Sequence, residues 1–223
     1  FADAVAQSVA GSLPGAVLTG NPLRRTISTL DRHAMRAQAR AHFGLPADGP
    51  VLLVFGGSQG SARINAAVTN LDDVTVLHSY GGKNDEPAPR SARYVPLPYI
   101  DRMDLAYAAA DLAVCRSGAM TVAEVTAVGL PACFVPFAVG NGEQTRNAQP
   151  VVAAGGALLV ADRDFTSQWV RDHVVPLLHN AQELARMSAA AAEKARGYTW
   201  AFAAARLRRV YADLAARDRV VCK

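Results

Sequence analysis

The sequence is poor in cysteine and in charge, and it has no long hydrophobic run. Only 3 of its 223 residues are cysteines, 19% are charged and 51% are hydrophobic. Cys115, Cys133 and Cys222 are odd in number and form no C-x-x-C pair, which argues against a disulfide framework or a cysteine zinc site and favours a reducing cytoplasm. The longest apolar run, 151–161, is far shorter than the roughly 20 residues that span a bilayer. Disorder is excluded because a chain this apolar can bury a core.

Charge is unevenly distributed along the chain. The formal net charge is +4, and residues 193–223 hold eight Lys or Arg against three Asp or Glu, so the remainder is nearly neutral. This distribution disfavours a nucleic-acid surface, which needs basic residues spread over one face. The chain begins with Phe1, and 1–9 reads as the tail of a helix, so we expect a fragment of a longer protein.

Short apolar segments alternate with segments of helical period. The continuous apolar character of the strands is typical of a parallel sheet covered on both faces, so we expect a Rossmann-like doubly wound α/β domain. Ligands would bind where the loops follow the strands. The expected strands are 16–19, 51–55, 74–78, 93–95, 112–115, 132–135 and 157–160. The expected helices are 28–43, 61–70, 101–110, 119–128, 143–154, 166–178, 181–196 and 201–216, with a mobile loop at 81–93.

The first loop of chemical interest runs from Gly56 to Gly60 with the sequence GGSQG. Glycines let backbone N–H groups approach a ligand closely, and the helix that follows offers its N-terminus to an anion. The loop lacks the ending of a P-loop and the full G-x-G-x-x-G pattern of dinucleotide folds. It is therefore either a phosphate-binding loop or a turn that lets strand and helix pack.

The second loop leads into the expected helix 119–128. The backbone N–H groups of Ala119 to Thr121 would face a diphosphate, and Glu124 lies where acidic residues bind ribose in dinucleotide folds. The pattern Thr121-x-x-Glu124 also matches a capping box, which is a purely structural alternative. Arg116 is either part of the site or a salt-bridge partner.

The third loop is rich in Gly and Asn and leads into the expected helix 143–154. Glu143, Gln144 and Asn147 lie three or four residues apart and share a helix face. Amides both donate and accept hydrogen bonds and so suit sugar hydroxyls, although a solvated first turn has the same composition.

Eight ordered signatures within residues 14–180 resemble the MurG family, the UDP-N-acetylglucosamine:lipid I N-acetylglucosaminyltransferases of glycosyltransferase family 28. They are TGNPLR at 19–24, GGSQG at 56–60, YIDRM at 99–103, AAAD at 108–111, RSGAMTVAE at 116–124, GLP at 129–131, VPF at 135–137 and Q-x-x-N at 144–147. Two departures are Ser61 in place of the usual Ala and a short stretch 70–93.

The resemblance implies the GT-B fold, in which two Rossmann-like domains enclose a cleft. This chain would supply the C-terminal half: the end of the acceptor domain and the interdomain linker at 1–24, a donor-binding domain at 25–197, and a basic helix at 198–223 that crosses back to the N-terminal domain. The acceptor half would be missing, and with it the histidine that acts as general base in the family. No histidine of this chain matches that role. No catalytic residue is therefore expected in this chain.

The resemblance also implies how the site is divided. Arg24 and the backbone of Ile100 would flank uracil, Glu124 would bind ribose, and Gln144 would bind the GlcNAc hydroxyls. The diphosphate would be held by Ser58 and by the N–H groups of Ala119, Met120 and Thr121. Supporting residues would be Gly56, Gly57, Gln59, Gly60, Arg116, Ser117, Gly118 and Asn147.

The implied reaction is an inverting transfer of GlcNAc from UDP-GlcNAc to the muramyl 4-hydroxyl of lipid I, giving lipid II for peptidoglycan, with no cofactor and no metal. Lipid I would be bound at the membrane through the missing half, cell-wall synthesis proteins are possible partners, and no nucleic acid is expected. The enzyme would be peripheral on the cytoplasmic face of the plasma membrane. Backbone donors would stabilise the leaving group.

Two alternative functions stay open. The chain could be a stand-alone UDP-sugar-binding module, or part of another GT-B enzyme such as a glycolipid synthase or an epimerase. An oxidoreductase is disfavoured because the nicotinamide fingerprint is absent.

The basic helix at 201–216 could also contact anionic lipid or present a solvated face.

Overall fold

The body of the protein is a six-stranded, wholly parallel sheet. The computed structural model describes residues 2–9, 11, 13–88, 91–139, 141–195 and 200–218. The strand order is β5-β4-β3-β6-β7-β8. This confirms the expected doubly wound α/β fold. The bounds are β3 Val51–Phe55, β4 Thr75–Ser79, β5 Tyr94–Leu97, β6 Leu112–Cys115, β7 Ala132–Phe134 and β8 Ala157–Leu159.

The order of the strands places a switch point between β3 and β6. From β3 the chain first moves to one side, through β4 and β5, and then returns to build β6, β7 and β8 on the other side. Phe55 at the end of β3 pairs with Cys115 at the end of β6, so the loops after these strands leave the sheet side by side. Crevices of this kind bind ligands in open α/β sheets.

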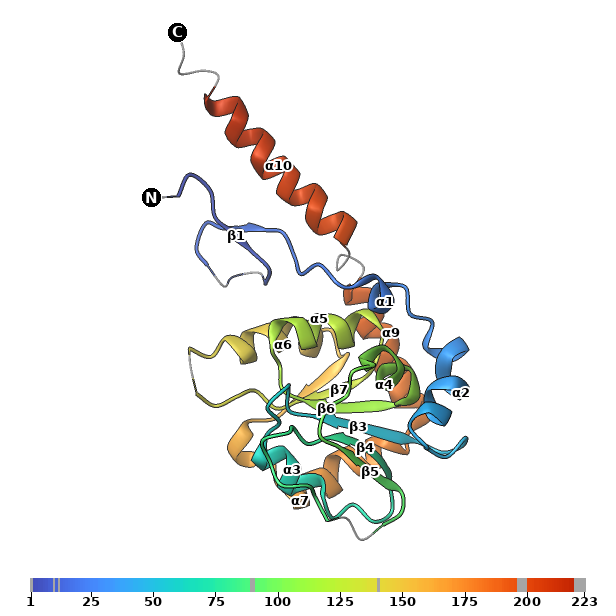
Figure 1. Ribbon diagram of the computed structural model, residues 1–223. Helices are drawn as coiled ribbons and strands as arrows, with labels where there is room; N and C mark the ends of the chain where they lie inside the picture. The colour runs from blue at the N-terminus through green and yellow to red at the C-terminus, as the bar shows by residue number, and fades with distance from the viewer. Residues whose placement is uncertain are drawn as a thin grey trace.

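Helices cover both faces of the sheet (Figure 1). Alternate residues of β3 point to opposite faces: Leu53 joins a core with α2, α4, α5, α6 and α9, and Val54 joins a core with α3 and the 165–178 region. Both faces are therefore apolar, as the continuous strand pattern requires. The helices are α1 Arg25–Ser28, α2 Arg32–His42, α3 Ala62–Val68, α4 Met103–Ala109, α5 Ala119–Ala127, α6 Glu143–Ala153, α7 Ser167–Trp169, α8 Val175–Leu178, α9 Ala181–Ala195 and α10 Trp200–Asp218.

Two of the expected helices are interrupted. The helix expected at 28–43 is split into α1 and α2, because the Asp31 carboxylate accepts from the N–H groups of His33 and Ala34 (both 3.0 Å) and starts a new helix. The helix expected at 166–178 contains a π-helical segment, η2 Val170–Val174, between α7 and α8. Pro176 has no N–H to continue the regular ladder at that point.

The N-terminal segment is extended rather than helical. The expectation of a helix tail at 1–9 is wrong, because Ala6–Gln7 forms strand β1, which pairs in parallel with β2 at Val17–Leu18. The Gln7 side chain ties the pair together by donating to the Ala16 carbonyl (2.9 Å) and accepting from the Leu13 N–H (3.0 Å). Both β1 and α10 stand away from the α/β body in Figure 1.

A buried polar network lies beneath the turn that follows β4. Asn65 donates to the Tyr80 carbonyl (3.0 Å), so its amide oxygen accepts from Nε2–H of His78 (3.0 Å). Nδ1 of His78 then accepts from the Tyr94 hydroxyl. Burial lowers the pKa of His78 to about 4 and raises that of Tyr94 to about 12, so both groups are neutral at pH 7.

The unfolding free energy is expected to fall by about 3 kcal/mol between pH 6.5 and pH 4, because the unfolded chain takes up a proton at His78 that the folded chain excludes. Urea denaturation across this range tests the effect. His78→Gln should flatten the pH dependence by that amount, whereas His33→Gln, on the exposed side of α2, should leave it unchanged. Titration of the His78 imidazole near pH 6.5 by NMR would contradict the expectation.

Candidate functional site

The loops after the strands line an open cavity of about 610 Å³ at the switch point. None of the side chains that line it is acidic and two are arginines, so its electrostatic character favours an anion. Its lining residues are Gly56, Gly57, Ser58, Gln59, Gly60, Ser61, Ala62, Arg63, Arg116, Gly118, Thr121, Phe137 and Gln144. The first and second loops expected from the sequence therefore come together with Gln144 of the third.

The glycine loop is held against the turn that follows β4. Gly60 has a φ of +72°, and a Cβ atom there would lie 1.9 Å from the Tyr80 carbonyl oxygen. The Asn84 amide donates to the carbonyl groups of Gln59 (2.8 Å) and Tyr80 (2.9 Å). The start of the segment expected to be a mobile loop is thus anchored to the wall of the cavity.

Arg116 joins the loops that follow four strands. Its guanidinium donates to the carbonyl groups of Val135 (3.0 Å) and Pro136 (3.2 Å), to Ser61 Oγ (2.7 Å) and to the Asp162 carboxylate. The arginine side chain is only 12% exposed. Arg116 is both a salt-bridge partner of Asp162 and part of the cavity lining, and Ser61 is an anchor for it as well as the N-cap of α3.

Helix α5 begins at Ala119, with Gly118 as its N-cap and no side-chain cap. The capping-box alternative is therefore wrong. The first intrahelical bond is donated by the Val122 N–H to the Gly118 carbonyl, which leaves the N–H groups of residues 119–121 outside the helical ladder. These are the groups expected to meet a diphosphate.

Glu124 is held by two partners. Its Oε1 accepts from Nη2 of Arg24 (3.1 Å), and its Oε2 accepts from the Tyr107 hydroxyl (2.9 Å). Burial, together with the neighbouring Glu124 carboxylate, raises the pKa of Tyr107 well above its usual value, so the hydroxyl stays a donor. The residues expected at uracil and at ribose, Arg24 and Glu124, are thus in direct contact.

Gln144 is oriented by the backbone of two loops. Its Oε1 accepts from the N–H groups of Phe137 (2.9 Å) and Ser117 (3.3 Å), while Asn147 donates to the Ser117 carbonyl (3.1 Å). Nε2 of Gln144 has no partner among the described residues, and Gln144 lines the cavity. The side chain therefore offers a donor to a ligand.

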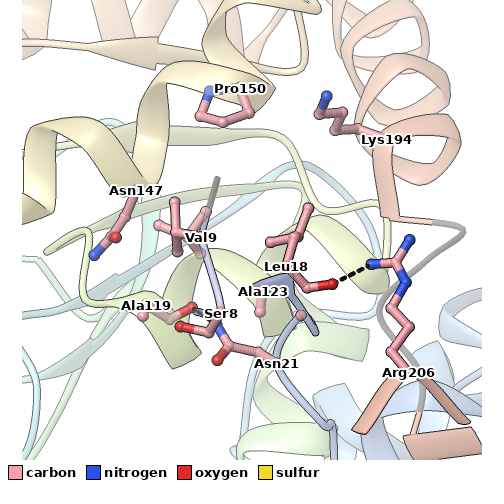
Figure 2. Close-up of a pocket in the computed structure, with 12 residues that line it drawn as sticks. Ser8, Val9, Leu18, Asn21, Ala119, Ala123, Asn147, Pro150, Lys194 and Arg206 are labelled. Carbon is pink, nitrogen blue, oxygen red and sulfur yellow. Dashed lines mark hydrogen bonds between the residues drawn. The ribbon is translucent and has the colours of Figure 1, made fainter. Parts of the chain in front are cut away.

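Several expected site residues lie outside the cavity. Ile100 is buried, Met120 is exposed, and Ala119 and Asn147 line a second cavity of about 230 Å³ (Figure 2). Lys194 of α9 and Arg206 of α10 lie on its far wall, and Arg206 donates to the Leu18 carbonyl (3.4 Å). Residues of helix α5 line both cavities.

Three residues that shape the site are not among those singled out from the sequence. Tyr107 sits in an ordinary helical pattern that carries no sign of its role. Arg63 and Asp162 form an ion pair (2.9 Å) at the cavity. The local sequence signal for Asp162 is the Asp162-x-Asp164 pair, which begins three residues after the end of β8. Asp162 is bound by Arg63 and Arg116, and the described residues contain no group of three or more His, Cys, Asp or Glu that could hold a metal.

The chain belongs to glycosyltransferase family 28: the model of the family's C-terminal domain matches residues 51–199. Similar proteins come from Rhodococcus opacus B4 (54% identity, 92% of this chain and 55% of that protein) and Mycolicibacterium vanbaalenii (58% identity, 81% and 47%). Both are named UDP-N-acetylglucosamine--N-acetylmuramyl-(pentapeptide) pyrophosphoryl-undecaprenol N-acetylglucosamine transferase. The chain thus spans about half the length of these relatives.

Solved structures share the fold. The crystal structure of Acinetobacter baumannii MurG matches with a TM-score of 0.64 and 23% identity over 89% of this chain and 57% of that chain. The calicheamicin glycosyltransferase CalG4 matches with a TM-score of 0.55 and 22% identity over 75% and 43%. The fold is that of the GT-B glycosyltransferases. No helix within the described ranges is long and apolar enough to cross a membrane.

Gly60→Ala is expected to lower the unfolding free energy by about 2–4 kcal/mol, because the methyl group would collide with the Tyr80 carbonyl at a positive φ. Gly57→Ala is the matched control, since Gly57 also has a positive φ but faces open space, and it should cost only about 1 kcal/mol. Urea denaturation compares the two variants. Equal losses would mean that the close approach of the two loops is not a constraint.

Proposed function

We propose that this chain is the donor-binding part of an enzyme that transfers GlcNAc from UDP-GlcNAc to lipid I, forming the lipid II precursor of peptidoglycan. The observation that carries the proposal is the cavity at the switch point, which combines a glycine loop, the N-terminus of α5 and two arginines with no acidic lining residue. The printed names of the Rhodococcus and Mycolicibacterium relatives support the choice of sugar donor and lipid acceptor.

Each part of UDP-GlcNAc has a proposed place in this chain. The diphosphate lies against Ser58 and the N–H groups that begin α5, and the ribose hydroxyls meet Glu124. Uracil lies between Arg24 and the backbone of Ile100. The free Nε2 of Gln144 donates to a GlcNAc hydroxyl, in keeping with the two backbone bonds that fix its Oε1. The acceptor site and the general base belong to the part of the relatives that this chain does not span.

The domain boundaries expected from the sequence follow the same proposal. Residues 25–197 form the donor domain, 1–24 are the end of the acceptor domain and the interdomain linker, and 198–223 cross back to an N-terminal domain. Within these ranges, 1, 10, 12, 89–90, 140, 196–199 and 219–223 lie outside the described residues. Exposed apolar side chains on both outlying segments support this placement, since such side chains ordinarily seek cover. They are Val5, Leu13, Val17, Leu18, Phe202, Leu207 and Tyr211. Lipid I and a peripheral position at the cytoplasmic face of the membrane are then reached through the other half of the enzyme.

Calorimetric titration of the chain with UDP, UDP-GlcNAc and UDP-GalNAc tests the proposal. Binding of UDP and a preference for the GlcNAc sugar are expected. Glu124→Gln should weaken UDP and UDP-GlcNAc alike, by about tenfold, because the ribose contact is common to both ligands and a neutral amide is a poorer acceptor.

Glu183→Gln is the matched control, because Glu183 lies on α9, does not line the cavity and forms an ion pair with Arg186. Its nucleotide affinity should equal that of the unmodified chain. Absence of UDP binding by the folded chain would contradict the proposed function. Unchanged affinity in folded Glu124→Gln would instead assign Glu124 solely to its contacts with Arg24 and Tyr107.

A further inference from the structure

Arg63 lies at the wall of the anion-favouring cavity, and only part of its guanidinium forms hydrogen bonds. Its side chain is 48% exposed, and its Nε donates to Oδ2 of Asp162 (2.9 Å). The two terminal Nη groups have no partner among the residues that the structure describes, and Arg63 lines the cavity together with the glycine loop. The guanidinium is thus held through its Nε, and its two Nη groups remain available to a ligand.

The other arginine of the cavity is not available in this way. Arg116 is 12% exposed, and its Nη groups are occupied by Ser61, Asp162 and two backbone carbonyls. Asp162 contacts both arginines but carries a single negative charge. The excess positive charge therefore resides at Arg63, the more exposed of the two.

We propose that Arg63 binds the diphosphate of the nucleotide sugar, with Asp162 holding the guanidinium in position. This inference rests on the proposed function and adds to it a side-chain cation that the sequence did not single out. A guanidinium matches the geometry of phosphate oxygens through paired N–H donors. The tether from Nε to Asp162 leaves those paired donors free and lowers the entropy lost when they bind.

The binding of UDP and of uridine by Arg63 variants tests the proposal, since the two ligands differ only in the diphosphate. Arg63→Ala should weaken UDP by about tenfold or more and leave uridine unchanged. Arg63→Lys keeps the charge but loses the paired donors, so its UDP affinity should fall between those of the unmodified chain and the alanine variant. Calorimetry serves for UDP and ligand-observed NMR for uridine.

Arg163→Ala is the matched control. Arg163 lies next to Asp162 in sequence, is 86% exposed and does not line the cavity, so this variant removes the same charge nearby without touching the site. Its UDP affinity should stay within about twofold of the unmodified chain. A loss in Arg163→Ala equal to that in Arg63→Ala would overturn the proposal in favour of a general charge effect.

UDP binding by the unmodified chain distinguishes a failure of this inference from a failure of the proposed function. UDP binding that is equal in the unmodified chain and in Arg63→Ala would overturn the inference and leave the proposed function standing. An equal loss of uridine and UDP would also overturn it, because the diphosphate would then not be the group contacted. Absence of UDP binding by the unmodified chain would overturn both. Thermal unfolding of Arg63→Lys confirms that the lysine variant used for comparison is folded.

Discussion

The ion pair between Arg116 and Asp162 is the interaction on which the candidate site depends. A parallel sheet sends the loops after its strands to one edge, but it does not set the spacing between them. The guanidinium of Arg116, which follows β6, holds three other loops together. It donates to Ser61 after β3, to the carbonyl groups of Val135 and Pro136 after β7, and to Asp162 after β8. Removing Asp162 would leave the mostly buried Arg116 guanidinium without a compensating charge, at a cost of about 3–5 kcal/mol, whereas removing Arg116 would leave Asp162 still paired with Arg63.

Close approach of the loops and the start of a helix add backbone groups to the side chains that line the cavity. Gly60 approaches the Tyr80 carbonyl so closely that any side chain would collide with it. Helix α5 begins without a side-chain cap, so the N–H groups of its first turn lie outside the helical ladder and have no side-chain partner among the described residues. A wall built of N–H groups and arginines attracts anions through fixed dipoles and charges.

The strands of the main sheet and the three loops could be predicted from the sequence, because apolar runs and glycine turns are local patterns, whereas the order of the strands in the sheet comes from the fold. The break at Asp31 also has a local signal, an N-cap residue, which the helical period of 28–43 concealed. The pairing of Arg24 with Glu124 joins residues 100 positions apart and leaves no mark in periodicity. The same is true of Arg63 and Asp162, 99 positions apart, so the electrostatics of the site emerge only from the fold.

The contact between Arg24 and Glu124 is compatible with the proposed ribose contact. An ionised carboxylate has about four lone-pair sites, and Arg24 and Tyr107 occupy one on each oxygen. The remaining lone pairs can accept from the two hydroxyls of a ribose without displacing either partner. Arg24 and Tyr107 then orient the carboxylate before the nucleotide arrives, which reduces the entropy lost on binding. A residue held this firmly is better suited to recognising a fixed pair of hydroxyls than a solvated carboxylate would be.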